Sequence, residues 1–215
     1  MTEAYPATIA TSIERELVIR KSRFIARLTP VRSVAEADEA IGRIRRTHWD
    51  AAHNCSAMIT GLRGDQARSS DDGEPAGTAG VPMLEVLRRR ELTDVVAVVT
   101  RYFGGVKLGA GGLIRAYSTA VSEALDSARL VHRRDLTQLR IEVDHSEAGR
   151  FDNLLRESAP QWGAIVGEAV YGRGVTLEVW TPPDAIERVR AELAAASAGS
   201  VTALTGESRI VDVPT

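Results

Sequence analysis

A glycine-rich segment between an apolar run and a helical pattern constrains the fold of this chain more than any other feature. Residues 95–99 form the longest unbroken apolar run, which is typical of a central strand that is buried on both faces. Five glycines follow within residues 104–112, and apolar residues then recur at helical spacing over about residues 113–131. The sequence therefore predicts a buried strand, a loop with unusual backbone and a long helix.

The composition of this loop indicates an anion-binding site. Glycine lets successive backbone N–H groups point toward one side, and the positive end of the following helix dipole adds to their attraction for an anion. No acidic residue occurs in residues 95–122. We predict that the residues that bind phosphate or nucleic acid are Arg101, Gly104, Gly105, Lys107, Gly109, Gly111, Gly112 and Arg115. The alternative is that the glycines only permit tight packing of the helix on the sheet.

Two known phosphate-loop patterns do not match this segment. A Walker loop ends in Lys-[Ser/Thr], whereas Lys107 lies in the middle of the glycines, and the third glycine of a dinucleotide fingerprint is replaced by Ile114. Aromatic residues near the loop would suit base stacking where they are exposed. We expect Phe103 to belong to the core instead, because it continues the apolar strand.

A second polar segment, residues 68–80, contains Asp71, Asp72 and Glu74. Carboxylates suit Mg²⁺, but the segment lacks the alternating Asp spacing and the terminal Glu of a calcium loop. A solvated turn, or an ion pair with Arg101 or Lys107 that joins the two loops, are the alternatives to a metal site. We predict no metal and no cofactor.

A thiol and an imidazole lie two residues apart on a strand predicted over about residues 54–62. Alternate strand residues share one face at about 7 Å separation, so His53 and Cys55 exceed the hydrogen-bond distance that a nucleophile and its base require. We therefore expect a packed Cys55 beside polar residues at the edge of a cleft.

Two groups of arginines occur where predicted helices end, at residues 43–46 and 88–90. Cations at these places favour the helix dipole and the last carbonyl groups. A nucleic-acid groove is the alternative use for both groups.

Element order and charge divide the chain into two predicted domains, residues 1–135 and 136–215. The second half has the order β-α-β-β-α-β of a ferredoxin-like layer and carries 7 basic and 12 acidic residues, against 20 and 17 in the first half. In the first half, a strand from Ser22 precedes a helix that Ser33 and Glu36 begin as a capping box. These patterns predict an α+β fold class.

The single cysteine and the short apolar runs favour the cytoplasm. One Cys55 forms no disulfide framework, and no apolar run approaches the roughly 18 residues of a membrane helix. The N-terminal region carries Glu3, Glu14 and Glu16 and lacks the apolar part of a signal peptide. We predict a cytoplasmic protein that has no membrane contact.

Three stretches, residues 53–57, 70–80 and 101–113, resemble the IMPACT family in its bacterial YigZ-type form. The resemblance implies an N-terminal domain like domain 2 of ribosomal protein S5 and a ferredoxin-like second domain, a pairing similar to the last two domains of elongation factor G. Eukaryotic members regulate translation in the amino-acid-starvation response through protein contacts. The family's polar cluster falls on a predicted cleft formed by His53, Asn54, Asp71, Asp72, Glu74 and Thr78, beside the loop cations. Ser56 and Ala76 depart from the family pattern, which has an aromatic residue and a serine there.

These observations favour a non-enzymatic factor of translation or the stress response that binds structured RNA or the ribosome through the loop. One alternative is an enzyme or a sensor that binds a phosphate-bearing small molecule, and another is a protein-interaction module that regulates translation. Because the net charge is only −2, a basic RNA-binding surface must be local.

Overall fold

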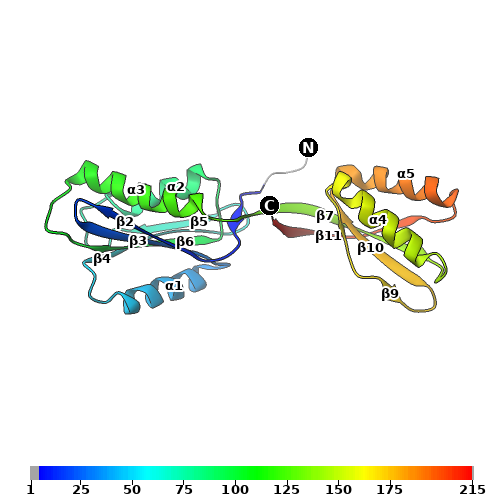
Figure 1. Cartoon of the computed structure of the whole chain (residues 1–215), viewed down its shortest axis with the longest axis horizontal. Helices are drawn as coiled ribbons and strands as arrows, with labels where there is room; N and C mark the ends of the chain where they lie inside the picture. The colour runs from blue at the N-terminus through cyan, green and yellow to red at the C-terminus, as the bar shows by residue number, and fades with distance from the viewer. Residues whose placement is uncertain (1–4, 215) are drawn as a thin grey trace. The chain divides into compact units, whose positions relative to one another are not determined.

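The computed structural model describes residues 5–214 and shows a mixed α/β protein with two sheets (Figure 1). The chain divides into two compact units. We call residues 5–132 the N-terminal unit and residues 133–212 the C-terminal unit.

The N-terminal unit contains a five-stranded antiparallel sheet in the order β2-β3-β6-β4-β5. Helices α2 and α3 lie on one face of this sheet and α1 on the other (Figure 1). The elements are β1 (Thr8–Ile9), β2 (Ile13–Ile19), β3 (Ser22–Pro30), α1 (Val34–Thr47), β4 (His53–Thr60), β5 (Gln66–Ser70), α2 (Gly80–Arg89), β6 (Val95–Tyr102) and α3 (Ala110–Asp126).

Strand β6 is central because both of its faces are apolar. Val95, Ala97 and Val99 pack into the core beneath α2 and α3, whereas Val96 and Val98 pack beneath α1. Successive strand residues point to opposite faces, so a continuous apolar run supplies two cores at once. The prediction of a central strand followed by a loop and a helix is confirmed.

The start of α1 follows the predicted cap, with one difference. Ser33 Oγ accepts a hydrogen bond from the Glu36 backbone N–H at 3.2 Å. The Glu36 carboxylate accepts a hydrogen bond from the backbone N–H of Arg32 at 2.8 Å. In a capping box it would accept from the N–H of Ser33 instead.

The end of α3 and several strands differ from the sequence prediction. The predicted helix extended to Val131, but α3 ends at Asp126, and Leu130 and Val131 pair with Ile9 and Thr8 of β1. This pairing joins residues more than 100 positions apart, which local periodicity does not show. Strands β2 and β5 were also absent from the prediction.

The C-terminal unit follows the predicted order of elements with one difference. It contains β7 (Leu130–Val143), which begins in the N-terminal unit, then α4 (Ala148–Trp162), β8 (Ile165–Val166), β9 (Val170–Tyr171), β10 (Val175–Thr181), α5 (Ile186–Ser197) and β11 (Ala203–Pro214). The strand expected over residues 164–171 is divided into β8 and β9. The core is formed by the inner faces of β7 and β10 with α4 and α5. In the part of the chain that the structure describes, no helix is both long and apolar enough to cross a membrane.

Candidate anion-binding site at the glycine loop

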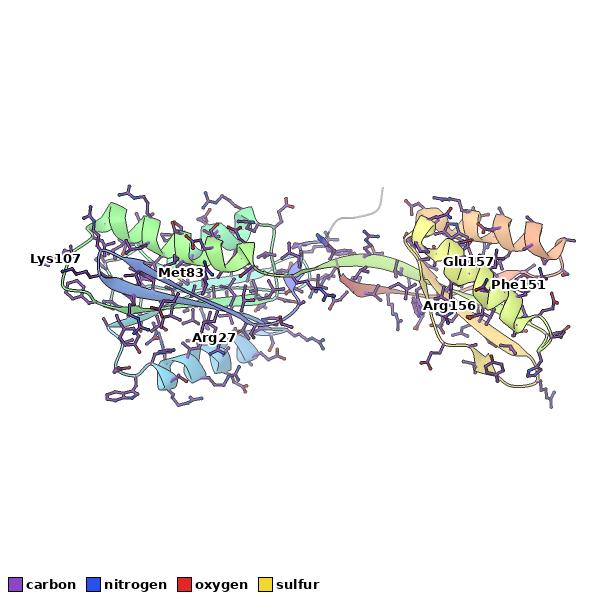
Figure 2. All side chains as sticks on the ribbon, viewed as in Figure 1. Arg27, Met83, Lys107, Phe151, Arg156 and Glu157 are labelled. Carbon is purple, nitrogen blue, oxygen red and sulfur yellow. The ribbon has the colours of Figure 1, made fainter. Side chains whose placement is uncertain are left out.

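The loop between β6 and α3, residues 103–109, is called the glycine loop here. Gly105, Val106, Lys107 and Gly109 are exposed, and Figure 2 shows Lys107 at an edge of the N-terminal unit. None of the backbone N–H groups of residues 105–112 has a hydrogen-bond partner among residues 5–214, and no side chain caps α3. The loop and the first turn of the helix therefore offer a row of free donors to an anion.

Packing explains two of the glycines but not the others. A Cβ on Gly104 would lie 2.0 Å from the Lys21 backbone, and one on Gly112 would lie 2.9 Å from Leu108 Cβ. A Cβ on Gly105, Gly109 or Gly111 would meet nothing within 4 Å, but Gly105 and Gly109 have positive φ values of 81° and 73°, which favour glycine. Gly111 has an ordinary helical backbone, so the packing alternative leaves this glycine without a structural reason.

The hairpin turn between β2 and β3 adds two cations that the sequence analysis missed. Arg20 and Lys21 are exposed and have positive φ values of 46° and 67°, a conformation that costs a side-chain-bearing residue about 1–2 kcal/mol. The turn contacts the glycine loop, because Gly104 donates its backbone N–H to Ser22 Oγ at 3.2 Å. No Gly, Asn or Asp marks this turn, so nothing local in the sequence indicates it.

Arg101 is buried and does not present its charge to solvent. Its guanidinium donates to Glu74 Oε1 at 2.6 Å, and the two side chains are 6% and 3% exposed. Its Nε is buried without a partner among the described residues. The ion pair that joins the two loops, left open as an alternative by the sequence, is present in the structure.

Glu74 is the centre of a buried polar network. The Tyr117 hydroxyl donates to Glu74 Oε1 at 2.7 Å, and His53 Nε2 lies 3.8 Å from Oε2. His53 Nδ1 lies 2.8 Å from the Asp72 carbonyl oxygen. Because a carbonyl only accepts, Nδ1 carries the proton and Nε2 faces the carboxylate.

Cys55 belongs to this network as a buried thiol. It donates its one proton to the Asp71 carbonyl at 2.9 Å, and its Sγ lies 3.3 Å from the Tyr117 hydroxyl oxygen. Burial raises the pKa of Cys55 to about 12, and burial also raises the pKa of Tyr117. A thiolate nucleophile is therefore disfavoured, as the strand geometry predicted.

Other residues of the polar segment 68–80 form hydrogen bonds with backbone groups. Asp71 accepts hydrogen bonds from the N–H groups of Gly77, Ala79 and Gly80 at the start of α2. Partial burial opposes ionisation of Asp71, but these donors outweigh it and lower its pKa. Thr78 donates its hydroxyl to the Pro75 carbonyl.

Asp72 connects α1 to β4. Its carboxylate accepts from Arg45 at 2.8 Å and from the Asn54 N–H at 2.6 Å, and Asn54 Oδ1 accepts from Thr100. Within residues 5–214, no group of three or more His, Cys, Asp or Glu side chains is placed to hold a metal ion.

The aromatic residues are arranged differently from the prediction. Phe103 was expected in the core but is 52% exposed, because β6 ends at Tyr102. Tyr117 is fully buried. The Arg115 side chain is exposed and has no hydrogen bond or ion pair to any described residue. The exposed features at this end of the unit therefore include the free amides, Phe103 and the side chains of Arg20, Lys21, Lys107 and Arg115.

Two family models match separate parts of the chain. Residues 20–125 match the Impact N-terminal domain, and residues 141–200 match a domain of unknown function, DUF1949. The chain thus has the two-domain organisation of an Impact N-terminal domain followed by DUF1949.

Named relatives match this chain over most of their length. The chain is 47% identical over 173 residues to "IMPACT family member YvyE" of Bacillus subtilis (strain 168), covering 80% of this chain and 78% of that protein. It is 36% identical over 204 residues to "IMPACT family member YigZ" of Escherichia coli (strain K12), covering 94% and 97%. A solved structure, "Crystal structure of an hypothetical protein", matches with a TM-score of 0.60 and 34% identity over 95% of this chain and 98% of that chain. This chain belongs to the IMPACT family.

Proposed function

We propose that the N-terminal unit binds the phosphate backbone of structured RNA, alone or in the ribosome, and that the protein acts in translation or its regulation in the cytoplasm. The proposed surface consists of the glycine loop, the Arg20–Lys21 turn and the first turns of α3. In this proposal Arg101 and the buried polar network around Glu74 position the two loops and do not bind RNA themselves.

The free backbone donors of residues 105–112 are the observation that carries the proposal. Exposed N–H groups at the start of a helix form a ready binding site for phosphate, and here the exposed cations Lys21, Lys107 and Arg115 lie on the same segments. Carboxylates near the loop do not compete, because Glu74 is paired with Arg101 and Asp71 with backbone.

The strained turn supports the same function. The dipeptide Asn-Gly would adopt the positive φ values of this turn at a lower energetic cost than Arg20 and Lys21 do. Strain of this kind is concentrated at functional sites. Exposed Phe103 adds an aromatic face on which an unpaired base could stack. Cations, free amides and an exposed ring together fit RNA better than a small anion.

The fold assignment is part of the proposal. We infer that the N-terminal unit is of the ribosomal-protein-S5 domain 2 type and that the C-terminal unit is ferredoxin-like. The strand order β11-β7-β10-β8 supports the second assignment, since it places the two central strands, β7 and β10, as the first and third of the β-α-β-β-α-β order.

Salt dependence of binding to a fluorescent RNA hairpin tests the proposal. The logarithm of the affinity should fall linearly with the logarithm of the salt concentration, by about 0.7–0.9 for each phosphate contacted. Lys107→Ala and Arg115→Ala should each lower this slope by about that amount. Arg46→Ala is the matched control, because Arg46 is exposed on α1 across the sheet and should leave the slope unchanged.

Three results would contradict the proposal. They are no binding of the hairpin at low salt, binding that is independent of salt, or a change of slope in the Arg46 control equal to that in the loop variants. Retention of a protein partner after nuclease treatment and high salt would instead favour the protein-interaction alternative.

A further inference from the structure

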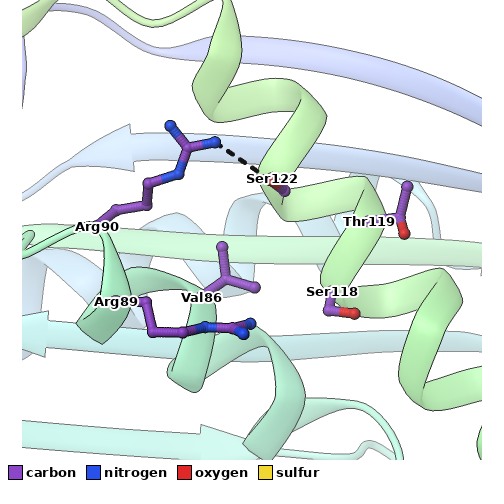
Figure 3. A pocket seen from close by; sticks show the side chains of 6 residues that line it. All are labelled: Val86, Arg89, Arg90, Ser118, Thr119 and Ser122. Carbon is purple, nitrogen blue, oxygen red and sulfur yellow. Dashed lines mark hydrogen bonds between the residues drawn. The ribbon is translucent and has the colours of Figure 1, made fainter.

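An open groove separates α2 from α3 at the C-terminal end of α2 (Figure 3). Its cavity volume is about 290 Å³. Residues of both helices line it, namely Val86, Arg89, Arg90, Ser118, Thr119 and Ser122. The α3 residues lie more than two turns after the start of that helix, so the groove is separate from the free amides of the glycine loop.

The groove presents cations and hydroxyl groups without a carboxylate in its lining. Arg89 extends from α2 toward α3 (Figure 3), and its Nε donates to the Glu85 carbonyl at 3.3 Å. The terminal nitrogens of Arg89 have no hydrogen-bond partner in residues 5–214. The carboxylate of Glu85 pairs with Arg88 at 3.0 Å and therefore leaves Arg89 unneutralised.

The hydroxyl groups supply further donors. Arg90 donates to Ser122 Oγ at 3.3 Å and also pairs with Asp126. Since Ser122 Oγ is an acceptor in this bond, its own proton is available to a ligand. The Thr119 hydroxyl has no partner in the described part of the chain, whereas Ser118 donates to the Ile114 carbonyl.

A second groove of similar size differs from the α2–α3 groove in the pairing of its arginines. It has a volume of about 260 Å³ beside α1, and its lining includes Arg27 and Arg43. Both arginines face carboxylates, Arg27 with Glu14 at 3.4 Å and Arg43 with Glu39 at 3.9 Å. Only the α2–α3 groove, of these two, has an arginine whose charge is left without a carboxylate.

We propose that the α2–α3 groove binds the phosphate group of a small phosphoester of sugar-phosphate size. The guanidinium fork of Arg89 matches two phosphate oxygens, and the hydroxyls of Thr119 and Ser122 donate to the same group. The volume lies near the lower limit for small-molecule pockets, about 300 Å³, which suits a sugar phosphate better than a dinucleotide. This site uses residues that the RNA-binding proposal does not use.

Calorimetric titration of the full chain with ribose 5-phosphate tests this site. We expect saturable binding of ribose 5-phosphate and none of ribose. Arg89→Gln should weaken binding by about tenfold or more, which corresponds to about 1.4 kcal/mol. Arg46→Gln is the matched control, since it removes the same charge from an exposed side chain on α1 that does not line the groove.

Three results would overturn the proposal. These outcomes are no saturable binding, binding of ribose equal to that of its phosphate, or equal weakening by Arg46→Gln and Arg89→Gln. If ribose 5-phosphate does not bind but Arg89→Gln lowers the salt slope of RNA binding, the groove is part of the RNA surface and not a small-molecule site.

Discussion

Replacing Glu74 by methionine should destabilise the N-terminal unit by about 3–5 kcal/mol, because it leaves a buried guanidinium without its counter-charge. Arg101 is only 6% exposed in its side chain and already has one unpartnered buried nitrogen. Glu74→Met also removes the acceptor of the Tyr117 hydroxyl. Both losses arise in the interior, where solvent does not replace the missing partner.

The double variant Glu74→Met/Arg101→Met should be more stable than Glu74→Met alone. It removes the uncompensated charge and leaves the Tyr117 hydroxyl as the group without its partner, a cost of about 1–3 kcal/mol. Glu85→Met is the exposed control. Its pair with Arg88 has side chains 51% and 53% exposed, so the cost should stay below about 1 kcal/mol.

Hydrogen exchange measured by mass spectrometry on peptides from β6 and α3 gives the unfolding free energy of this unit alone, even if the other unit unfolds separately. The reasoning fails if Glu74→Met costs less than the Glu85 control. It also fails if the double variant is no more stable than Glu74→Met.

Three further predictions concern single sites. The folded-state pKa of Cys55 is raised from 9.0 to about 12. Its thiol therefore favours folding below pH 9, and this contribution to stability is lost as pH rises from 9 to 12. Urea midpoints of the wild type should fall over this range more than those of Cys55→Ala. The pKa of Asp71 is lowered, so its carboxylate stabilises the fold above pH 3.8 and this contribution is lost as pH falls. Asp71→Ala should therefore lower the free energy of unfolding by about 1–2 kcal/mol at neutral pH. The difference from wild type in urea midpoint should shrink as pH falls below 3.8. The pair Arg20→Asn/Lys21→Gly should raise stability by about 1–2 kcal/mol, by relief of the positive φ values, while lowering RNA affinity in the hairpin assay; a loss of stability would contradict the assignment of strain.

The sequence was sufficient where the signal is local. The helical cap at Ser33, the two-sided strand β6 and the element order of the C-terminal unit all depend on neighbouring residues or on short periodicity. The glycine loop was visible for the same reason, since five glycines and an absence of acids occur in one short segment.

The sequence was insufficient where contacts join distant segments. The burial of Arg101 depends on Glu74, 27 positions earlier, so a cation expected at the surface is in the core. The Arg20–Lys21 turn contacts the glycine loop through Ser22 and Gly104, 82 positions apart. Phe103 is exposed because β6 ends one residue before it, and the apolar pattern does not show where the strand ends.

The placement of the hairpin turn against the glycine loop has a practical consequence. Lys21 and Lys107 are the two lysines of the chain, and both lie on the segments that meet at Gly104. Amine-reactive reagents will therefore modify the lysines of this surface, while the 25 arginines of the chain stay unlabelled. Reductive methylation with a ¹³C label would give two resolved side-chain signals that report directly on occupancy of the surface, without any engineered probe.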